Sequence, residues 1–334
     1  MGHIIIASSS LAASLSEDAG VRSGFALSYE DIIFHLGHEN FLQDKLTQPD
    51  RIVRIASDEY SDAVGDLLFA LGASDQPGMP TLAERLTARL DCDWQSLLNI
   101  DELLQIETLS YHHLCERHAT GRLDHNGLVA DLAQLLGSRQ GTIMEPLLDA
   151  MSIHLAMCPS FTRSVADANL VQLEKLFSSE DLPVAEGGFF DQRFINYLSD
   201  RPEQLEDINW RQFEGLTAEW FSRAGYSVEL GPGRDDGGVD VRVWNPEAAP
   251  GTPPAIIVQC KREKRKVGKV VVKALWADVN EERAHSGLIV TTSDISPGAA
   301  HVCDARSYPI TTANRQKVQS WIKAMRRPEV GIVL

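Results

Sequence analysis

The stretch that decides the fold is GPGRDDGGVDVRVW (231–244), followed by a Pro-rich break (245–254) and AIIVQCKRE (255–263). Residues 239–244 and 255–258 are short runs rich in β-branched residues and bounded by Gly and Pro, which is typical of strands. Because side chains alternate along a strand, we expect one face of the first run to carry Asp240, Arg242 and Trp244, with the three valines opposite.

The second strand is expected to have Ile257, Gln259 and Lys261 on one face and Cys260 on the other. A hairpin around 245–254 would then bring a carboxylate beside an amide and an ammonium at one end of a sheet. Metal-assisted hydrolysis of a phosphodiester requires such groups.

Asp240 is a hard oxygen ligand suited to Mg²⁺, which keeps several waters and takes one or two carboxylates from a protein. The metal lowers the pKa of a bound water and stabilises the charge that develops on the phosphate. Lys261 would hold that water or neutralise the transition state. Glu214, near the start of a helical stretch, would supply a second carboxylate.

Four short motifs occur in order: F-E-x-L at 213–216, G-G-V-D at 237–240, Q-C-K-R at 259–262 and V-T-T at 290–292. Each alone is a weak signal. Together, over residues 209–325, they resemble the Mrr-like (type IV restriction-type) endonucleases of the PD-(D/E)xK nuclease superfamily, in the branch whose third motif is QxK. The resemblance implies an α/β C-terminal domain, a restriction-endonuclease-like mixed sheet flanked by helices.

The resemblance also implies the site residues. It assigns catalysis to Asp240, Gln259, Lys261 and Glu214, and it assigns the metal, Mg²⁺ with Mn²⁺ as a substitute, to Asp240, Glu214 and Gln259. Gln259 departs from the acidic residue of the commoner motif. A neutral amide binds Mg²⁺ less strongly than a carboxylate does, so we expect the site to depend more on Glu214 and a backbone carbonyl.

The alternative is structural: Asp240 would be a surface carboxylate beside a turn, and Lys261 would start a solvated basic run. That interpretation suits either residue alone, but four motifs in order favour the nuclease. The intact set also argues against an inactive relative. Asp235 and Asp236 are interpreted as residues of a Gly-rich turn rather than as metal ligands.

A basic run follows the third motif directly. This run could be a solvated turn. Alternatively, it contacts DNA phosphates, and such contacts position the duplex without recognising its sequence. The expected DNA-binding residues are Arg262, Lys264, Arg265, Lys266 and Lys269.

The charge is unevenly distributed along the 334 residues. The formal net charge is −16, which is unexpected for a nucleic-acid-binding protein. From residue 206 onward there are 18 Lys and Arg against 16 Asp and Glu, a net charge of +2, whereas the preceding residues have 13 against 31, a net charge of −18. This asymmetry suggests a division of labour, with DNA contacts in the last third of the chain.

The chain length suits about two domains. Residues 29–178 read as a succession of amphipathic helices, with 94–118 the longest and 164–177 the last. The acidic segment 178–188 contains Pro and Gly and is the best boundary. We therefore expect a mostly α-helical domain at 1–187, a connector at 188–205 with a helix at 189–198, and the nuclease domain at 206–334.

Within the nuclease domain, periodicity and turn residues predict four helices and five strands. The helices are expected at 210–224, 267–284, 297–306 and 315–325. The strands are expected at 226–230, 239–244, 255–261, 287–292 and 309–312.

His112, His113, Cys115 and His118 form a tempting metal constellation on the longest helix. Zinc sites usually draw four ligands from more than one element, so we interpret this group as a helical flank. The five Cys residues are scattered and lack CxxC spacing, which suits a reducing compartment.

Taken together, these features predict a cytoplasmic, Mg²⁺-dependent DNA endonuclease. The resemblance implies a setting in prokaryotic antiviral defence, either restriction of modified foreign DNA or the nuclease effector of a larger anti-phage system. Cutting both strands needs two sites, which predicts a homodimer or higher even oligomer. The acidic domain would bind a defence-system protein partner, sense a trigger or restrain the nuclease. No apolar run approaches the ~20 residues that span a bilayer, so no membrane partner is expected.

Two other functions stay open. One is a repair or recombination nuclease that acts on damaged or branched DNA with the same residues. The other is a non-catalytic adaptor that binds nucleic acid or a partner protein.

Overall fold

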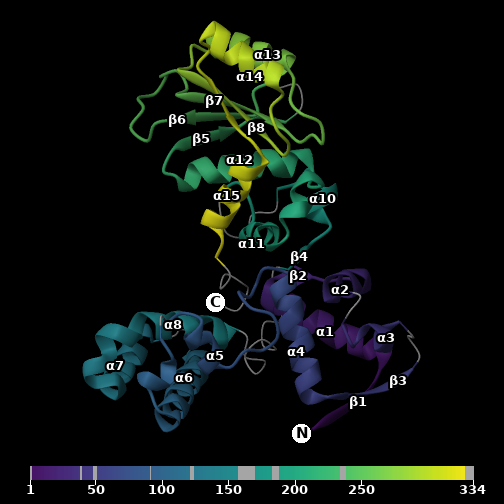
Figure 1. Cartoon of the computed structure of the whole chain (residues 1–334), viewed down its shortest axis with the longest axis vertical. Coiled ribbons are helices and arrows are strands. Elements are labelled where there is room, and N and C mark those ends of the chain that lie inside the picture. The colour runs from purple at the N-terminus through teal and green to yellow at the C-terminus, as the bar shows by residue number, and fades with distance from the viewer. Residues whose placement is uncertain are drawn as a thin grey trace. The chain divides into compact units, whose positions relative to one another are not determined.

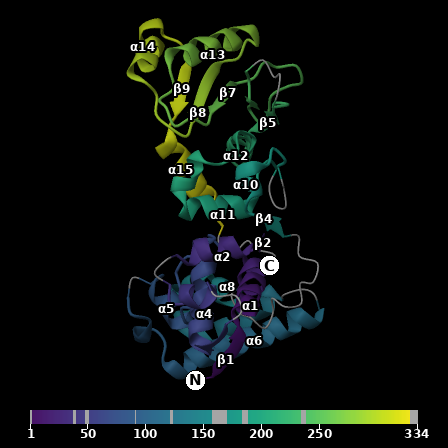
Figure 2. The same ribbon diagram turned by 90° about the vertical axis from the view of Figure 1, so that its right-hand side faces the viewer.

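The computed structural model describes residues 2–37, 40–47, 51–90, 92–120, 124–156, 170–182, 188–233 and 238–327. The chain forms two compact units, an N-terminal unit within Met1–Leu170 and a C-terminal unit, Val171–Arg327 (Figures 1 and 2). No helix in these described ranges is both long and apolar enough to cross a bilayer.

The first half of the N-terminal unit is a two-stranded antiparallel ribbon packed on helices. β1 (His3–Ala7) pairs with β3 (Ile52–Ala56), and a core of Leu, Ile and Val lies between the ribbon and the helices. The other elements here are α1 (Ser8–Ser23), β2 (Phe25–Ala26), α2 (Tyr29–Leu36), α3 (Gln43–Leu46) and α4 (Ser57–Ala70). The predicted run of helices missed β3, whose residues 52–55 alternate between exposed and buried, the period of a strand.

The second half of this unit is helical, with a separate leucine-rich core. Thr81 caps α5 through a reciprocal capping box with Glu84, which fixes the start of this helix. The elements are α5 (Leu82–Thr87), η1 (Trp94–Ser96), α6 (Ile100–Thr120), α7 (His125–Leu136), η2 (Gly137–Arg139) and α8 (Gln140–Ala156).

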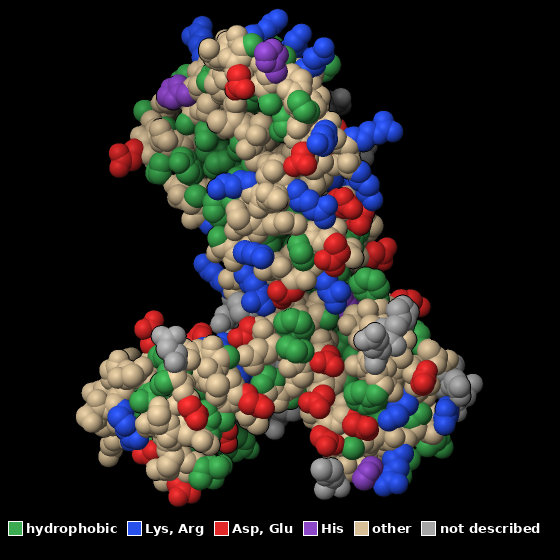
Figure 3. All heavy atoms as spheres, in the orientation of Figure 1, with side chains coloured by type: hydrophobic (Ala, Val, Ile, Leu, Met, Phe, Trp, Pro, Cys, Tyr) green, Lys and Arg blue, Asp and Glu red, His purple; other side chains and the backbone are tan. Residues whose placement is uncertain are grey.

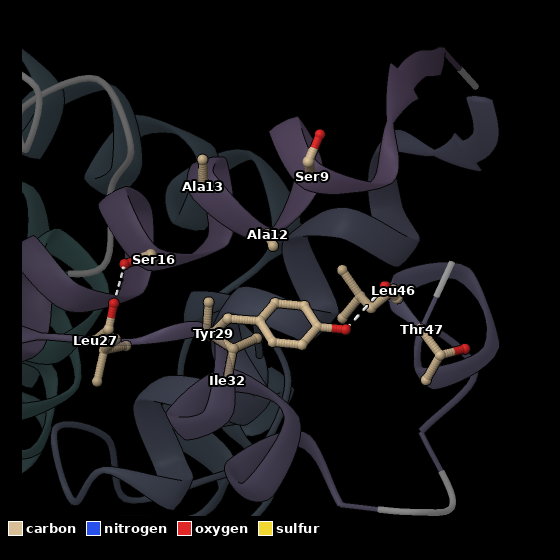
Figure 4. A pocket seen from close by; sticks show the side chains of 9 residues that line it. All are labelled: Ser9, Ala12, Ala13, Ser16, Leu27, Tyr29, Ile32, Leu46 and Thr47. Atoms are coloured by element: carbon tan, nitrogen blue, oxygen red, sulfur yellow. Dashed lines mark hydrogen bonds between the residues drawn. The ribbon is translucent and has the colours of Figure 1, made fainter. Parts of the chain in front are cut away.

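A pocket of about 560 Å³ opens in the N-terminal unit beside α1 (Figure 4). Small side chains of α1 form one wall, and the Tyr29 ring lies across from them with its hydroxyl donating to the Leu46 carbonyl oxygen at 2.9 Å. The lining contains no carboxylate, His, Lys or Arg, so it lacks the groups that phosphodiester hydrolysis requires.

The C-terminal unit is built on one five-stranded mixed sheet, which confirms the predicted fold class. In spatial order its strands are β5 (Ser227–Leu230), β6 (Val241–Trp244), β7 (Ile256–Lys261), β8 (Ser286–Thr291) and β9 (Ile310–Ala313). The first three are antiparallel neighbours, and β7, β8 and β9 run parallel. β8 is buried from its second residue onward, as expected for a central strand covered on both faces.

Helices cover both faces of this sheet (Figures 1 and 2). α12 (Trp210–Arg223) and α15 (Arg315–Met325) share one face, where Trp220 stacks on Trp321 with ring centroids 5.1 Å apart. α13 (Lys269–Glu281) and α14 (Pro297–Arg306) cover the other face, and Ser296 caps α14 just before Pro297. Every predicted strand and helix of the nuclease domain is present.

The C-terminal unit begins earlier in the chain than the predicted nuclease domain. It includes β4 (Val171–Gln172), α10 (Lys175–Ser178), α11 (Gln192–Asp200) and η3 (Pro202–Glu206). The buried Glu219 carboxylate accepts the amides of Gly188, Phe189 and Phe190 at 2.9, 2.8 and 3.3 Å, which fixes this segment against α12. Gly215 allows the close approach, because a Cβ there would lie 2.8 Å from the Phe189 carbonyl oxygen.

The helix predicted at 164–177 is wrong at 171–172, where β4 lies, and correct at 175–177, which belong to α10. Val171 and Leu173 are buried while Gln172 between them is exposed, and this two-residue period produces β4 rather than a helix. Residues 164–169 lie outside the described residues. The roles assigned to residues 1–187, 188–205 and 206–334 stay predictions. Residues 188–205 pack as part of the C-terminal unit, which contains the five-stranded sheet.

Candidate active site

Asp240 lies just before β6 and is fixed from both sides by backbone hydrogen bonds. Its amide donates to the Val258 carbonyl oxygen at 3.0 Å, and its own carbonyl oxygen accepts the Gly231 amide at 2.8 Å. Asp240 is only 8 % exposed, and its carboxylate accepts a hydrogen bond from the Cys260 amide at 2.6 Å. The carboxylate is therefore held at the carboxyl end of β7.

The strict alternation predicted for 239–244 holds only from Val241 onward. Val241 lies opposite Val258, whereas Val239 packs with Ile257 in the core beneath α13, on the other face. Gly238, with φ of 95°, precedes this break. The predicted faces of β7 are confirmed, because Ile257 faces α13 and the Cys260 thiol lies 3.5 Å from the Thr217 hydroxyl on α12.

Gln259 is buried and half satisfied. Its Nε2 donates to the Gly238 carbonyl oxygen at 3.0 Å, and its Oε1 has no hydrogen-bond partner among the described residues. Continuing the β6–β7 register from Val241 and Val258 places Gln259 opposite Asp240. A buried acceptor without a partner is costly, so this oxygen is suited to a ligand.

Glu214 projects from the first turns of α12 and is 5 % exposed. Its Oε2 accepts a hydrogen bond from the Arg211 Nη1–H at 2.8 Å. The two residues lie three positions apart, about one turn of the helix. Arg211 was not among the predicted site residues. Its position three residues before Glu214 was a signal available in the sequence, because side chains three apart are neighbours on a helix.

The Cys260 thiol lies in an acidic, largely buried environment. Burial raises its pKa well above the usual value, and the Asp240 and Glu214 carboxylates raise the pKa further. The Thr217 hydroxyl and the Lys261 ammonium act in the opposite direction. Of these groups, Asp240 is also joined to Cys260 directly, through the hydrogen bond from the Cys260 amide.

These residues fit a hard divalent cation. Two buried carboxylates and the unsatisfied Gln259 amide oxygen supply oxygen ligands, which Mg²⁺ and Mn²⁺ prefer. The described ranges contain no group of three His, Cys, Asp or Glu side chains that could hold a metal, so a site here needs the Gln259 oxygen and water as well. Asp235, Asp236 and Gly237 lie outside the described residues.

The expected DNA-binding residues form an exposed basic segment, 262–266, with Lys269 beyond it. Arg262 donates to the Glu206 carbonyl oxygen at 3.3 Å, and Lys264 forms a salt bridge with Asp207 at 3.1 Å. Arg265, Lys266 and Lys269 form no salt bridge with any described residue. Figure 3 shows Lys and Arg side chains gathered over the C-terminal unit, and Asp and Glu more frequent over the N-terminal unit.

The His-rich flank of α6 does not converge on one point in its described part. His113 is buried and bonds Asp131 at 2.9 Å, whereas His112 and Cys115 are exposed. The His118 side chain lies outside the described residues.

Comparisons with known proteins concern mainly the C-terminal unit. A family model described as a restriction endonuclease (Mrr_cat) matches residues 205–322, a range that contains all four predicted catalytic residues. An uncharacterized protein, y4cE, of Sinorhizobium fredii (strain NBRC 101917 / NGR234) is 24 % identical over 136 residues, which are 40 % of this chain and 35 % of that protein. The chain thus matches about a third of the length of this relative.

A solved structure, the MspJI restriction endonuclease in complex with a 27-mer oligonucleotide, is similar over 55 % of this chain and 40 % of its own, with 16 % identity and a TM-score of 0.30. Restriction endonuclease domains generally use divalent metals, in line with the oxygen-rich site. Residues 205–322 thus match the restriction endonuclease family model and carry all four motifs, so this part of the chain is a restriction-endonuclease-like domain.

Proposed function

We propose that this protein is a Mg²⁺-dependent DNA endonuclease that hydrolyses phosphodiester bonds of foreign or modified DNA in prokaryotic anti-phage defence. The observation that carries the proposal is the buried Asp240 carboxylate, bonded to the Cys260 amide between Gln259 and Lys261, together with the Gln259 Oε1 that has no partner among the described residues. A binding module would not need two carboxylates buried at one end of its sheet.

Each residue has a role in this proposal. Asp240, Glu214 and the Gln259 amide oxygen would hold Mg²⁺, which supplies an activated water and neutralises phosphate charge when bound. The Lys261 ammonium orients the attacking water and stabilises the negative charge of the transition state. The Cys260 amide keeps the Asp240 carboxylate oriented, and Arg211 does so for Glu214.

The first test is cleavage of methylated and unmethylated plasmid DNA by the full-length protein in Mg²⁺, Mn²⁺ and EDTA. The variants are Asp240→Ala and, as a matched control, Asp304→Ala, which removes an exposed carboxylate on α14. Metal-dependent cutting that only Asp240→Ala abolishes supports the nuclease, and a preference for one methylation state supports restriction. DNA binding without cutting in either metal would favour the adaptor.

The same assay on nicked, branched and damaged DNA separates defence from repair, because both functions use the same catalytic residues. A strong preference for branched or damaged substrates would assign the protein to repair or recombination. Double-strand cutting whose rate rises with protein concentration would support a homodimer or a higher even oligomer.

We further propose that the acidic N-terminal unit contacts a defence partner or restrains the nuclease. The support is the charge asymmetry, −18 before residue 206 against +2 after it. Deleting residues 1–170 tests restraint while keeping the packing unit that begins at Val171. Restraint predicts higher cleavage after the deletion, and equal or lower cleavage contradicts it.

A further inference from the structure

Three consecutive hydroxyl side chains at the end of β8 bind the backbone of the basic segment. Thr291 Oγ1 donates to the Lys261 carbonyl oxygen at 2.8 Å. Thr292 Oγ1 donates to the Glu263 carbonyl oxygen at 3.2 Å and accepts the Glu263 amide at 3.1 Å. Ser293 Oγ donates to the Arg265 carbonyl oxygen at 2.8 Å, so the chain is held at every second residue.

These contacts begin where the regular sheet stops. The β7–β8 register ends at Lys261 opposite Thr291, and backbone pairing resumes only at the bridge between Val267 and Ile295. Between those points, hydrogen bonds from the side chains of Thr292 and Ser293 take the place of strand-to-strand backbone hydrogen bonds. The segment 262–266 is thereby fastened at both ends and in the middle.

The burial of the threonine hydroxyls favours the observed conformation of segment 262–266. Thr291 and Thr292 are 0 % and 1 % exposed, while residues 262–266 are all exposed. A buried hydroxyl that loses its partner costs free energy, so the threonines favour the conformation in which the segment stays bound. The contacts of Arg262 with Glu206 and of Lys264 with Asp207 are exposed and weaker restraints on the same segment.

We propose that Thr292, with Thr291 and Ser293 beside it, positions the basic segment 262–266 to receive the phosphate backbone of a DNA substrate next to Lys261. The proposal rests on the proposed nuclease function. Ordering the segment in advance lowers the entropy that DNA binding must otherwise supply. The cations then follow the end of β7 at a fixed spacing from the catalytic ammonium.

The test replaces Thr292 by Val in the full-length protein, which keeps the shape and removes the hydroxyl. Hydrogen exchange of the Glu263 amide is measured together with duplex binding in EDTA at two salt concentrations, followed by kcat and KM in Mg²⁺. Thr292→Ser is the rescue variant, and Thr311→Val, at an exposed position of the neighbouring β9, is the matched control.

In Thr292→Val we expect faster hydrogen exchange at the Glu263 amide and DNA binding about tenfold weaker than in wild type. The salt dependence of binding should be shallower, because fewer cations are held in place. The loss should appear in KM more than in kcat, and Thr292→Ser should stay within about twofold of wild type. Should Thr292→Val fail to fold, Ser293→Ala, which removes the Arg265 contact and leaves both Thr292 contacts with Glu263 in place, should show a smaller loss of the same kind.

Unchanged exchange in Thr292→Val, or faster exchange with wild-type DNA affinity, would overturn the role while leaving the proposed function intact. A wild-type protein that binds no DNA would overturn both. A merely structural threonine would lower stability without shifting KM or the salt dependence.

Discussion

The Asp240 carboxylate and the Cys260 amide are joined by a hydrogen bond of 2.6 Å across the β6–β7 pair. This bond orients a buried acid from the strand that carries Gln259 and Lys261, so one hairpin sets the geometry of three predicted catalytic residues. Because the donor is a backbone amide, the orientation does not depend on which side chain stands at position 260. The catalytic arrangement can therefore be tested residue by residue.

Asp240→Asn should keep the fold and lose the reaction. An asparagine oxygen still accepts the Cys260 amide, but the charge that binds a divalent metal is gone. We expect cleavage in Mg²⁺ to fall on the order of 10²–10³-fold, as when one electrostatic group of a catalytic site is removed. Plasmid cleavage and circular dichroism measure the two effects, and unimpaired cutting would rule out Asp240 as a metal ligand.

Gln259→Glu should make the protein more dependent on metal for its stability. A carboxylate is the better Mg²⁺ ligand, but it cannot donate to the Gly238 carbonyl oxygen as the amide does. We expect a lower melting temperature than wild type in EDTA and a larger rise on adding Mg²⁺ or Mn²⁺, because binding to the native state stabilises it. Equal metal-induced shifts in the two proteins would contradict a metal at Gln259.

Arg211→Met should destabilise the C-terminal unit by about 3 kcal/mol, because it leaves the buried Glu214 carboxylate without its guanidinium. Adding Glu214→Gln to Arg211→Met should recover part of that loss. Five of the six Trp residues lie after position 206, so denaturation followed by Trp fluorescence reports on this unit. Additive effects of the two substitutions would show that the pair is not coupled.

Cys260 should resist alkylation in the native protein. Burial, followed by the Asp240 and Glu214 carboxylates, raises its pKa, and the thiolate is the reactive form. Exposed Cys92 and Cys115 should react first with iodoacetamide at about pH 8, and the half-buried Cys260 more slowly than after denaturation. Peptide mass spectrometry identifies the labelled residues, and early labelling of Cys260 would contradict the packing around Asp240.

Asp278→Asn should raise the melting temperature at neutral pH. Burial and the neighbouring Glu281 and Glu282 raise the pKa of Asp278, so the native state takes up its proton more readily than the unfolded chain. The ionised carboxylate is therefore unfavourable at about pH 7, and this penalty disappears as the pH falls through the raised pKa. The gain should shrink toward about pH 4 in thermal melts, with Asp304→Asn as a control; a gain independent of pH would argue against this cause.

The sheet of the nuclease could be predicted because its signals are local. β-branched runs bounded by Gly and Pro define β6 and β7, and Ser296 before Pro297 defines the start of α14. The buried β8 was visible as a continuous apolar run. None of these depends on knowing what lies opposite in space.

The rest of the site depends on the fold itself. The break in alternation at Asp240 follows from the backbone around Gly238, which the pattern of valines conceals. The hydroxyl contacts of Thr292 with Glu263 join residues 29 positions apart, and the motif V-T-T gives no hint of their partner. In β3, Arg54 interrupts a short apolar run, so its two-residue period was hidden among helical patterns.

The packing of α11 limits where the nuclease domain can be joined to another protein by gene fusion. Gln192 on α11 donates to the Met325 carbonyl oxygen at 3.0 Å, and Asn196 accepts the Arg327 amide at 2.8 Å, so the start of the unit closes over its end. A recombination event that carried only the catalytic motifs into another gene would leave Phe190 and Phe194 behind and uncover the helices they protect. Gene fusions that preserve activity should therefore have their junctions upstream of this helix, well before the first catalytic glutamate.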